Sequence, residues 1–215
     1  MMNRPAPQET HSPHGSEKFG AVARSRVSLN ALLAGLVLLV ITGAMLLHFH
    51  LAMTRNADQT MRNSLRRAAL ACSLTVDPEV HGSLTDALQE GSPPYLEACR
   101  LLEDAKTAME GPEKFRFVYT CVLQDGEVRF ILDPTPAGDA DRDGVEDKSH
   151  LMESYPEASF ELITTLKTGE VTVMKEPQGD RWGTFLSGHA PICDHSGKVI
   201  AAVGVDMDLA LVFFS

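Results

Sequence analysis

An acidic segment at residues 139–147 has the residue types and the spacing of a calcium-binding loop. Carboxylates stand at its first, third and fifth positions, and a glycine stands at the sixth. Oxygen ligands at alternate positions can surround a hard cation, the glycine permits the sharp turn, and the seventh residue offers its carbonyl. The predicted ligands are Asp139, Asp141, Asp143, Val145 and Asp147.

The end of this segment differs from an EF-hand loop. An EF-hand closes the coordination shell with a bidentate glutamate at position twelve, where this chain has His150, and the nearest acid is Glu153. We therefore expect that no cofactor is required, with calcium as the one candidate and with weak affinity. A solvated acidic turn without metal stays open as the alternative, because short motifs also match by chance.

Catalytic motifs are not found in the chain. The sequence has no Gly-x-Ser-x-Gly turn, no HExxH helix and no glycine-rich phosphate loop. Ser187 and His189 would share one face of a strand, since alternate residues point the same way, but no acid near them in the sequence completes a triad. We expect that the chain is not an enzyme.

The charge distribution argues against nucleic acid as a partner. The formal net charge is −10, and most acidic residues lie after residue 54. Nucleic acids and anionic lipid surfaces are bound through basic patches, so the acidic part suits a cationic ligand or a divalent metal better. Four widely spaced cysteines include no CxxC pair, which leaves free thiols or a Cys72–Cys99 disulfide open.

An apolar stretch at residues 27–51 predicts a transmembrane helix. No Asp, Glu, Lys or Arg occurs between Arg26 and Arg55, and a helix of about 20 apolar residues spans a bilayer. The stretch is longer than a signal-peptide core and lacks a convincing cleavage site, which favours an uncleaved anchor over a cleaved signal peptide. Residues 1–26 predict a disordered cytoplasmic tail. The apolar residues 209–215 could begin a second transmembrane segment.

Beyond the membrane segment, the sequence predicts helices followed by mostly short strands. Helices are expected at 57–74, 95–109 and 156–167, and strands at 115–123, 128–132, 170–175, 182–192 and 198–205. Tight turns are expected at Asp125-Gly126, 177–180 and 194–197. In the first helix, apolar residues at alternating spacings of four and three predict the seam of a parallel homodimer. The seam residues are Met61, Leu65, Ala68 and Cys72.

The last predicted hairpin, at residues 181–206, resembles the closing segment of Cache domains, the extracytoplasmic PAS-like sensors of bacterial receptors. The matching residues are Trp182-Gly183, Ser187-Gly188, Ala190-Pro191-Ile192, Asp194, Gly197 and Gly204-Val205-Asp206. The resemblance implies an α+β fold at residues 55–208, in which a long N-terminal helix precedes a five-stranded antiparallel PAS-like sheet. One transmembrane helix would come before this single Cache domain.

The resemblance also implies a small-molecule pocket between the sheet and the segments that cross its outer face. The residues expected to line it are Tyr119, Arg129, Asp133, Tyr155, Trp182, His189 and Asp206. The arginine-tryptophan-tyrosine signature of amino-acid-binding double Cache domains is incomplete in this chain. The resemblance therefore implies a ligand without specifying an amino acid.

These expectations together predict a membrane-anchored extracytoplasmic ligand-sensing module for transmembrane signal transduction. It would be the input part of a histidine kinase, a diguanylate cyclase or a chemoreceptor. It would cross the inner (cytoplasmic) membrane once, with its C-terminal domain periplasmic or extracellular. Expected partners are a small-molecule or cation ligand, the membrane and a second copy of the chain through residues 57–74, but no nucleic acid. The alternative is a stand-alone anchored binding or scaffold protein with a structural calcium loop.

Overall fold

The computed structural model describes residues 17–111, 114–140, 142 and 144–208, with side chains from residue 28 onward. The chain divides into two compact units between Asn56 and Ala57. The predictions for residues 1–16 and 209–215, and for Asp141 and Asp143 as metal ligands, lie outside the described residues.

Helix α1 (Glu17–Ser73) contains the apolar segment of the first unit. It begins within the predicted tail, so residues 17–26 are helical. One 18-residue window of the helix has a mean hydropathy of 2.4, and none of that window is buried. By length and composition this helix can cross a membrane, although a signal sequence near the N-terminus would meet the same test.

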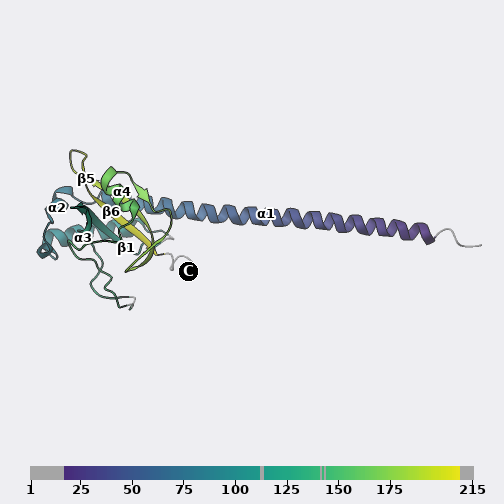
Figure 1. The fold of residues 1–215 in the computed structure, drawn as a ribbon, viewed down its shortest axis with the longest axis horizontal. Coiled ribbons are helices and arrows are strands. Elements are labelled where there is room, and N and C mark those ends of the chain that lie inside the picture. Colours follow the sequence, from purple (N-terminus) through teal and green to yellow (C-terminus); the bar gives the residue numbers. More distant parts are fainter. Residues whose placement is uncertain (1–16, 112–113, 141, 143, 209–215) are drawn as a thin grey trace, which may run out of the picture. The chain divides into compact units, whose positions relative to one another are not determined.

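In the second unit, the described residues after α1 form further helices and a sheet (Figure 1). In chain order the elements are α2 (Pro78–Ser83), the 3-10 helix η1 (Ala87–Gln89), α3 (Pro93–Met109), β1 (Phe117–Gln124), β2 (Glu127–Phe130), α4 (Phe160–Thr168), β3 (Thr172–Val173), β4 (Gln178–Asp180), β5 (Gly183–Cys193) and β6 (Val199–Asp208).

The sheet is antiparallel throughout and has the order β2-β1-β6-β5-β3. This antiparallel sheet, after a long N-terminal helix, confirms the predicted α+β fold of PAS-like type, but it has six strands where five were predicted. The short strand β4 pairs with β5 in addition, where the sequence analysis expects a turn at 177–180. The turn instead consists of Arg181 and Trp182. Trp182 therefore lies in the turn that connects the paired strands β4 and β5.

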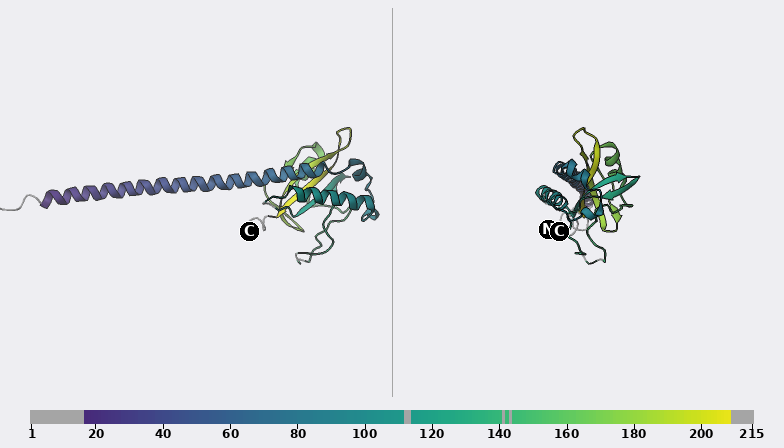
Figure 2. Two further views of the ribbon diagram at one scale, coloured as in Figure 1. Left: turned by 180° about the vertical axis from the view of Figure 1, so that it is seen from behind. Right: turned by 90° about the vertical axis from the view of Figure 1, so that its left-hand side faces the viewer.

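The two faces of the sheet are covered differently (Figure 2). Residues 57–73 of α1 and helix α3 lie on one face, and α4 lies on the other. Side chains alternate along a strand, so Val118, Val203 and Val205 belong to the cluster under α1 and α3, whereas Phe117 and Tyr119 belong to the cluster on the α4 face. The β1–β6 register places Tyr119 opposite Gly204 and Phe117 opposite Asp206.

Two of the three predicted tight turns are present, at Asp125-Gly126 and at 194–197. Asp125 and Gly126 have φ angles of 53° and 85°, and both values are in the left-handed region that a two-residue hairpin turn of this type requires. In the β5–β6 turn, the Asp194 backbone amide donates to the Lys198 carbonyl at 2.9 Å. Gly197, with a φ of 84°, completes that turn.

The prediction of which residues of α1 form a dimer seam was wrong. Leu65, Ala68 and Cys72 are fully buried against the sheet of their own domain, and Met61 packs at the edge of the same cluster. A helix that lies on a sheet needs an apolar stripe just as a coiled coil does, so the spacing could not distinguish the two. α1 ends at Ser73, and Asp77 caps α2 through its side chain.

All four cysteines are free thiols in the structure. Cys72, Cys99 and Cys121 are buried, whereas Cys193 is exposed. Burial raises the pKa of Cys72 to about 12, so this thiol is protonated and poorly nucleophilic at neutral pH.

Candidate ligand-binding site

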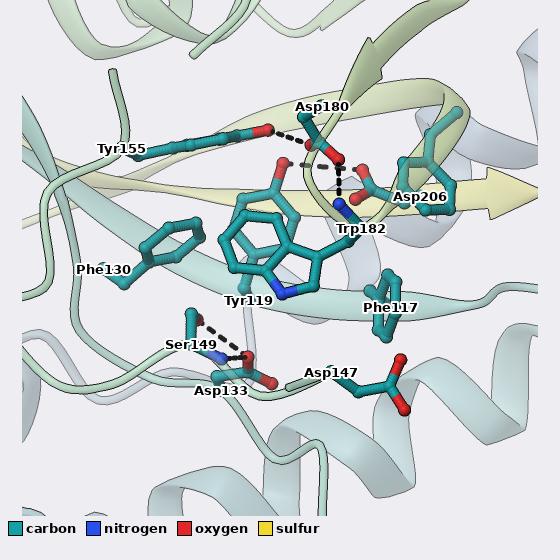
Figure 3. Close-up of a pocket in the computed structure, with 11 residues that line it drawn as sticks. Phe117, Tyr119, Phe130, Asp133, Asp147, Ser149, Tyr155, Asp180, Trp182 and Asp206 are labelled. Carbon is teal, nitrogen blue, oxygen red and sulfur yellow. Dashed lines mark hydrogen bonds between the residues drawn. The ribbon is translucent and has the colours of Figure 1, made fainter. Parts of the chain in front are cut away.

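A small cavity lies on the α4 face of the sheet, beneath the β4–β5 turn (Figure 3). Its lining combines aromatic rings with carboxylates and one serine. The lining residues are Phe117, Tyr119, Phe130, Asp133, Asp147, Ser149, Tyr155, Asp180, Trp182, Phe185 and Asp206. The free volume is about 20 Å³, which is room for about one water molecule. A larger ligand therefore requires a side chain to move.

Tyr119 forms part of the cavity floor because its partner on β6 is a glycine. A Cβ atom at Gly204 would overlap the Tyr119 ring, so any other residue would push the ring out of place. The Tyr119 hydroxyl donates to Asp206 Oδ1 at 3.4 Å. Gly204 thus sets the position of both a ring and a hydrogen bond of the cavity.

Asp206 is the most deeply buried carboxylate of the site, since the central strand β6 carries it and its residue is 4% exposed. Burial raises the pKa of Asp206 to about 7. A hydrogen bond from Ser187 opposes this rise, and the negative charge of Asp180 adds to it. The carboxyl group therefore changes charge near neutral pH.

Two of the other three carboxylates, Asp133 and Asp180, are held by neutral donors. Asp133 Oδ2 accepts from the backbone amide and the hydroxyl of Ser149, each at 2.7 Å. Asp180 accepts from the Tyr155 hydroxyl at 2.8 Å and from the Trp182 backbone amide at 2.9 Å.

Asp147 differs from these two carboxylates because it pairs with a cation. Its Oδ1 lies 3.1 Å from Arg116 Nη2, and its Oδ2 accepts from the Ala140 amide. These contacts connect the cavity wall to the acidic loop.

The aromatic side chains form a continuous cluster around the space. Ring centroids lie 4.6 Å apart for Phe130 and Tyr155, 5.5 Å for Phe130 and Trp182, and 5.9 Å for Tyr155 and Trp182. Trp182 is half-buried, and its indole N–H donates to the Glu146 carbonyl at 2.8 Å. It thus closes the cavity from the β4–β5 turn and is attached there to the acidic loop.

Five of the seven predicted ligand-binding residues line this cavity: Tyr119, Asp133, Tyr155, Trp182 and Asp206. His189 lines a smaller adjoining space, also bordered by Ser187 and Met174, and burial lowers its pKa to about 3, so the ring is neutral. Arg129 does not line the main cavity. It bonds to Glu127 and to the Met152 carbonyl.

The sequence analysis missed six residues that line the cavity: Phe117, Phe130, Ser149, Asp180, Phe185 and Asp147, the last of which was predicted as a metal ligand instead. Phe117 could have been found, because it shares a strand face with Tyr119 two residues later. Asp180 and Ser149 carried no such signal, since they lie in segments without a clear period. The fold brings those segments together.

The described part of the acidic loop contains no group of three His, Cys, Asp or Glu residues placed to hold one metal ion. Asp139 accepts from the Gly144 amide at 2.9 Å, and Asp147 belongs to the cavity wall. His150, at the closing position, contacts Glu90 and Glu146, and the Glu90 contact raises its pKa. Calcium binding at Asp139, Val145 and Asp147 stays a prediction.

No family model matches the chain, and no curated protein matches it. Solved structures with a similar fold include the ligand-binding domain of the Campylobacter jejuni chemoreceptor Tlp3 in complex with 4-methylisoleucine. That match has 13% identity and a TM-score of 0.43 over 73% of this chain and 53% of that one. This chain therefore spans about half of the Tlp3 domain.

The Escherichia coli DcuS sensor domain matches at 20% identity and a TM-score of 0.46, over 72% of this chain and 96% of that one. A structure named methyl-accepting chemotaxis protein X matches at 21% identity and a TM-score of 0.43, over 73% of this chain and 60% of that one. All three are named as sensory or chemotaxis proteins. Because these similarities are low, we draw the function from the residues of the site.

Proposed function

We propose that the chain is a membrane-anchored extracytoplasmic sensor module that binds a small ligand in this cavity. The observation that carries the proposal is a cavity on the α4 face of the sheet whose lining combines aromatic rings with four carboxylates. Ligand pockets typically combine an apolar lining with a few placed polar groups. Helix α1 contains both the apolar segment and the residues packed on the sheet, so it can carry a signal across a membrane.

Contacts between α1 and the sheet provide a route for that signal. A Cβ atom at Gly188 would lie 2.9 Å from the Leu65 backbone, which shows how closely α1 approaches β5. Arg62 donates to the carbonyls of Met174 and Lys175, which follow β3. Movement of β5 or β3 on ligand binding would therefore shift α1.

Signalling also requires that the ligand prefer one of two arrangements of the domain, because equal affinity for both shifts nothing. Outward displacement of Trp182 by a bound ligand is our candidate for the preferred arrangement, because Trp182 closes the cavity in this structure. The output partner would be a histidine kinase, a diguanylate cyclase or a chemoreceptor signalling part, reached through the inner membrane.

We assign no catalytic reaction to the domain. Asp206 receives its hydrogen bonds from Ser187 and Tyr119, and His189 Nδ1 lies 3.4 Å from the Thr172 hydroxyl. Ser187 thus contacts Asp206, whereas His189 contacts Thr172. A nucleophile activated by a neighbouring base needs the two within hydrogen-bond reach of each other.

Dimerisation remains part of the proposal, but through the other side of α1. Asn63 and Leu70 are exposed on that side, whereas Leu65 is buried. A cysteine at position 63 should therefore crosslink between chains in membranes more readily than one at position 65. Stronger crosslinking at 65 would contradict the packing of α1 on the sheet.

A melting-temperature screen of the purified full chain in detergent tests the sensor function. A ligand that binds the native state raises the melting temperature by mass action. The Gly204→Ala variant, in which the Tyr119 ring is displaced, should lose the response. Gly82→Ala is the matched control, because a Cβ there meets nothing within 4 Å. Equal responses in both variants would place the ligand outside the cavity.

A further inference from the structure

The charge of the cavity is one-sided. Four carboxylates line it and no Lys or Arg does. Among the described residues, Asp147 alone of the four forms an ion pair, with Arg116. Lys148 lies close by, but its ammonium group donates to the backbone carbonyl of Asp133 at 2.5 Å and to Tyr95. The cavity therefore holds an excess of negative charge.

Buried charge without a counter-charge is unfavourable unless something compensates it. Asp133, Asp180 and Asp206 have hydrogen-bond donors that are neutral, and these donors offset only part of the loss of hydration. A cation in the cavity would supply the missing charge. An anion would add to the repulsion, so carboxylates and phosphates are disfavoured as ligands.

The aromatic rings favour a cation of a particular kind. A ring face attracts a positive charge within about 6 Å of its centroid, and cages of such rings bind ammonium groups. Trp182 already shows this contact, because the Arg181 guanidinium lies 4.0 Å from its ring centroid. The rings of Tyr119, Phe130 and Tyr155 lie on the inner side of Trp182 (Figure 3).

A bare metal ion fits the site less well. Hard cations need several oxygen ligands at 2.0–2.6 Å, roughly, around one point. Among the described residues, no group of three His, Cys, Asp or Glu is placed to hold one ion. Aromatic rings also offer no oxygen ligand apart from the tyrosine hydroxyls, whereas they suit the alkyl surface of an organic cation.

We propose that the cavity binds a small organic ammonium ion, with its charge near Asp180 and Asp206 and its alkyl groups against the rings of Tyr119, Tyr155 and Trp182. The ligand class rests on the proposed sensor function. The ligand must be small and must displace Trp182, because the free volume of about 20 Å³ holds about one water molecule. Outward movement of Trp182 would break its bond to the Glu146 carbonyl and connect occupancy to the acidic loop.

The test is calorimetric titration of the full chain in detergent at about pH 8. The probes are choline, isobutylamine, 3,3-dimethyl-1-butanol, which is the uncharged analogue of choline, and succinate. We expect binding of choline or isobutylamine and none of the neutral analogue. Asp180→Asn, at a half-buried position, should weaken cation binding at least about tenfold. Asp125→Asn, in the exposed β1–β2 turn, removes the same charge far from the cavity and should leave binding unchanged.

The outcomes separate this inference from the sensor function. Binding of succinate instead of the cations, with loss in Gly204→Ala, would overturn the ligand class and leave the sensor function standing. Equal binding of choline and its neutral analogue would also overturn the ligand class, because charge would then have no part. If the chain binds none of these probes and the wider melting-temperature screen gives no response, both proposals fail.

Discussion

The two faces of the central sheet differ in the chemistry of their buried side chains. Under α1 and α3 the buried residues are almost entirely aliphatic or small, such as Leu65, Val203 and Val205. On the opposite face, the same strands contribute aromatic rings together with the carboxylate of Asp206. One strand, β6, thus presents Val205 to a sealed core and Asp206 to a cavity.

This difference is our basis for assigning stability to one face of the sheet and the proposed ligand binding to the other. An aliphatic face stabilises the fold through burial alone, at about 25 cal/mol per Å² of apolar surface. A buried carboxylate opposes folding unless it is compensated, so its presence on the other face points to a role beyond stability. Substitutions on the two faces should therefore have opposite effects. On the aliphatic face they should lower the free energy of unfolding and leave ligand affinity unchanged, whereas replacement of Asp206 should raise stability and lower ligand affinity.

The largest expected effect is that of Asp206→Asn on the pH dependence of stability. The pKa of Asp206 is raised from 3.8 to about 7 in the folded state, so between these values the unfolded chain has lost its proton while the native chain keeps it. The free energy of unfolding of the wild type therefore falls as pH rises through this window, by about 4 kcal/mol, and stays low above it.

The Asn variant lacks this loss and should be more stable than the wild type at about pH 8, while losing cation affinity. Urea denaturation of both proteins between about pH 4 and 8 measures the difference. Two parallel curves would mean that Asp206 ionises normally in the native state, and the contrast between the faces would lose its main support.

On the opposite face, Leu65→Ala should lower the free energy of unfolding by about 3 kcal/mol, since it leaves a cavity in a fully buried cluster. Ligand affinity of the folded fraction should change little, because Leu65 contacts the far side of the sheet. Denaturation and calorimetry on the same preparation check both points. A loss of less than about 1 kcal/mol would show that α1 is not packed as described.

Gly204→Ala should have an intermediate effect on stability and a large one on binding. The new methyl group displaces the Tyr119 ring, which costs about 1–3 kcal/mol for an overpacked core. Cation affinity should fall at least about tenfold, whereas Gly82→Ala should leave it unchanged. Unaltered binding in Gly204→Ala would remove Tyr119 from the site.

The smallest effect is expected for calcium at the acidic loop. Asp147 is already engaged with Arg116 and the Ala140 amide, so calcium should raise the melting temperature slightly and only at about millimolar concentration. Replacing Asp141 and Asp143 together by Asn should abolish this shift without changing cation binding in the cavity. A shift of equal size in the double variant would refute the calcium loop.

Much of the fold was predictable because its signals are local. The period-two pattern of β1 and the Asp125-Gly126 turn identified the first hairpin, and the alternation placed Tyr119 on a buried face. The apolar stripe of α1 that includes Leu65 was equally clear, but its meaning was ambiguous. A helix that packs on a sheet and a helix that packs in a dimer show the same spacing of apolar residues. Asp180 was not predicted as a cavity residue, because β4 is a short polar strand whose pairing with β5 depends on tertiary contacts.

Trp182 is the single tryptophan of the chain and closes the cavity, so its fluorescence reports on the site directly. A titration of the full chain with choline or isobutylamine, followed by tryptophan emission, tests whether binding occurs where we place it. The account predicts a saturable change in emission with the affinity measured by calorimetry. In Asp180→Asn this change should need at least about tenfold more ligand, and in Asp125→Asn it should be retained. A cation that binds by calorimetry and leaves the Trp182 emission unchanged would contradict it.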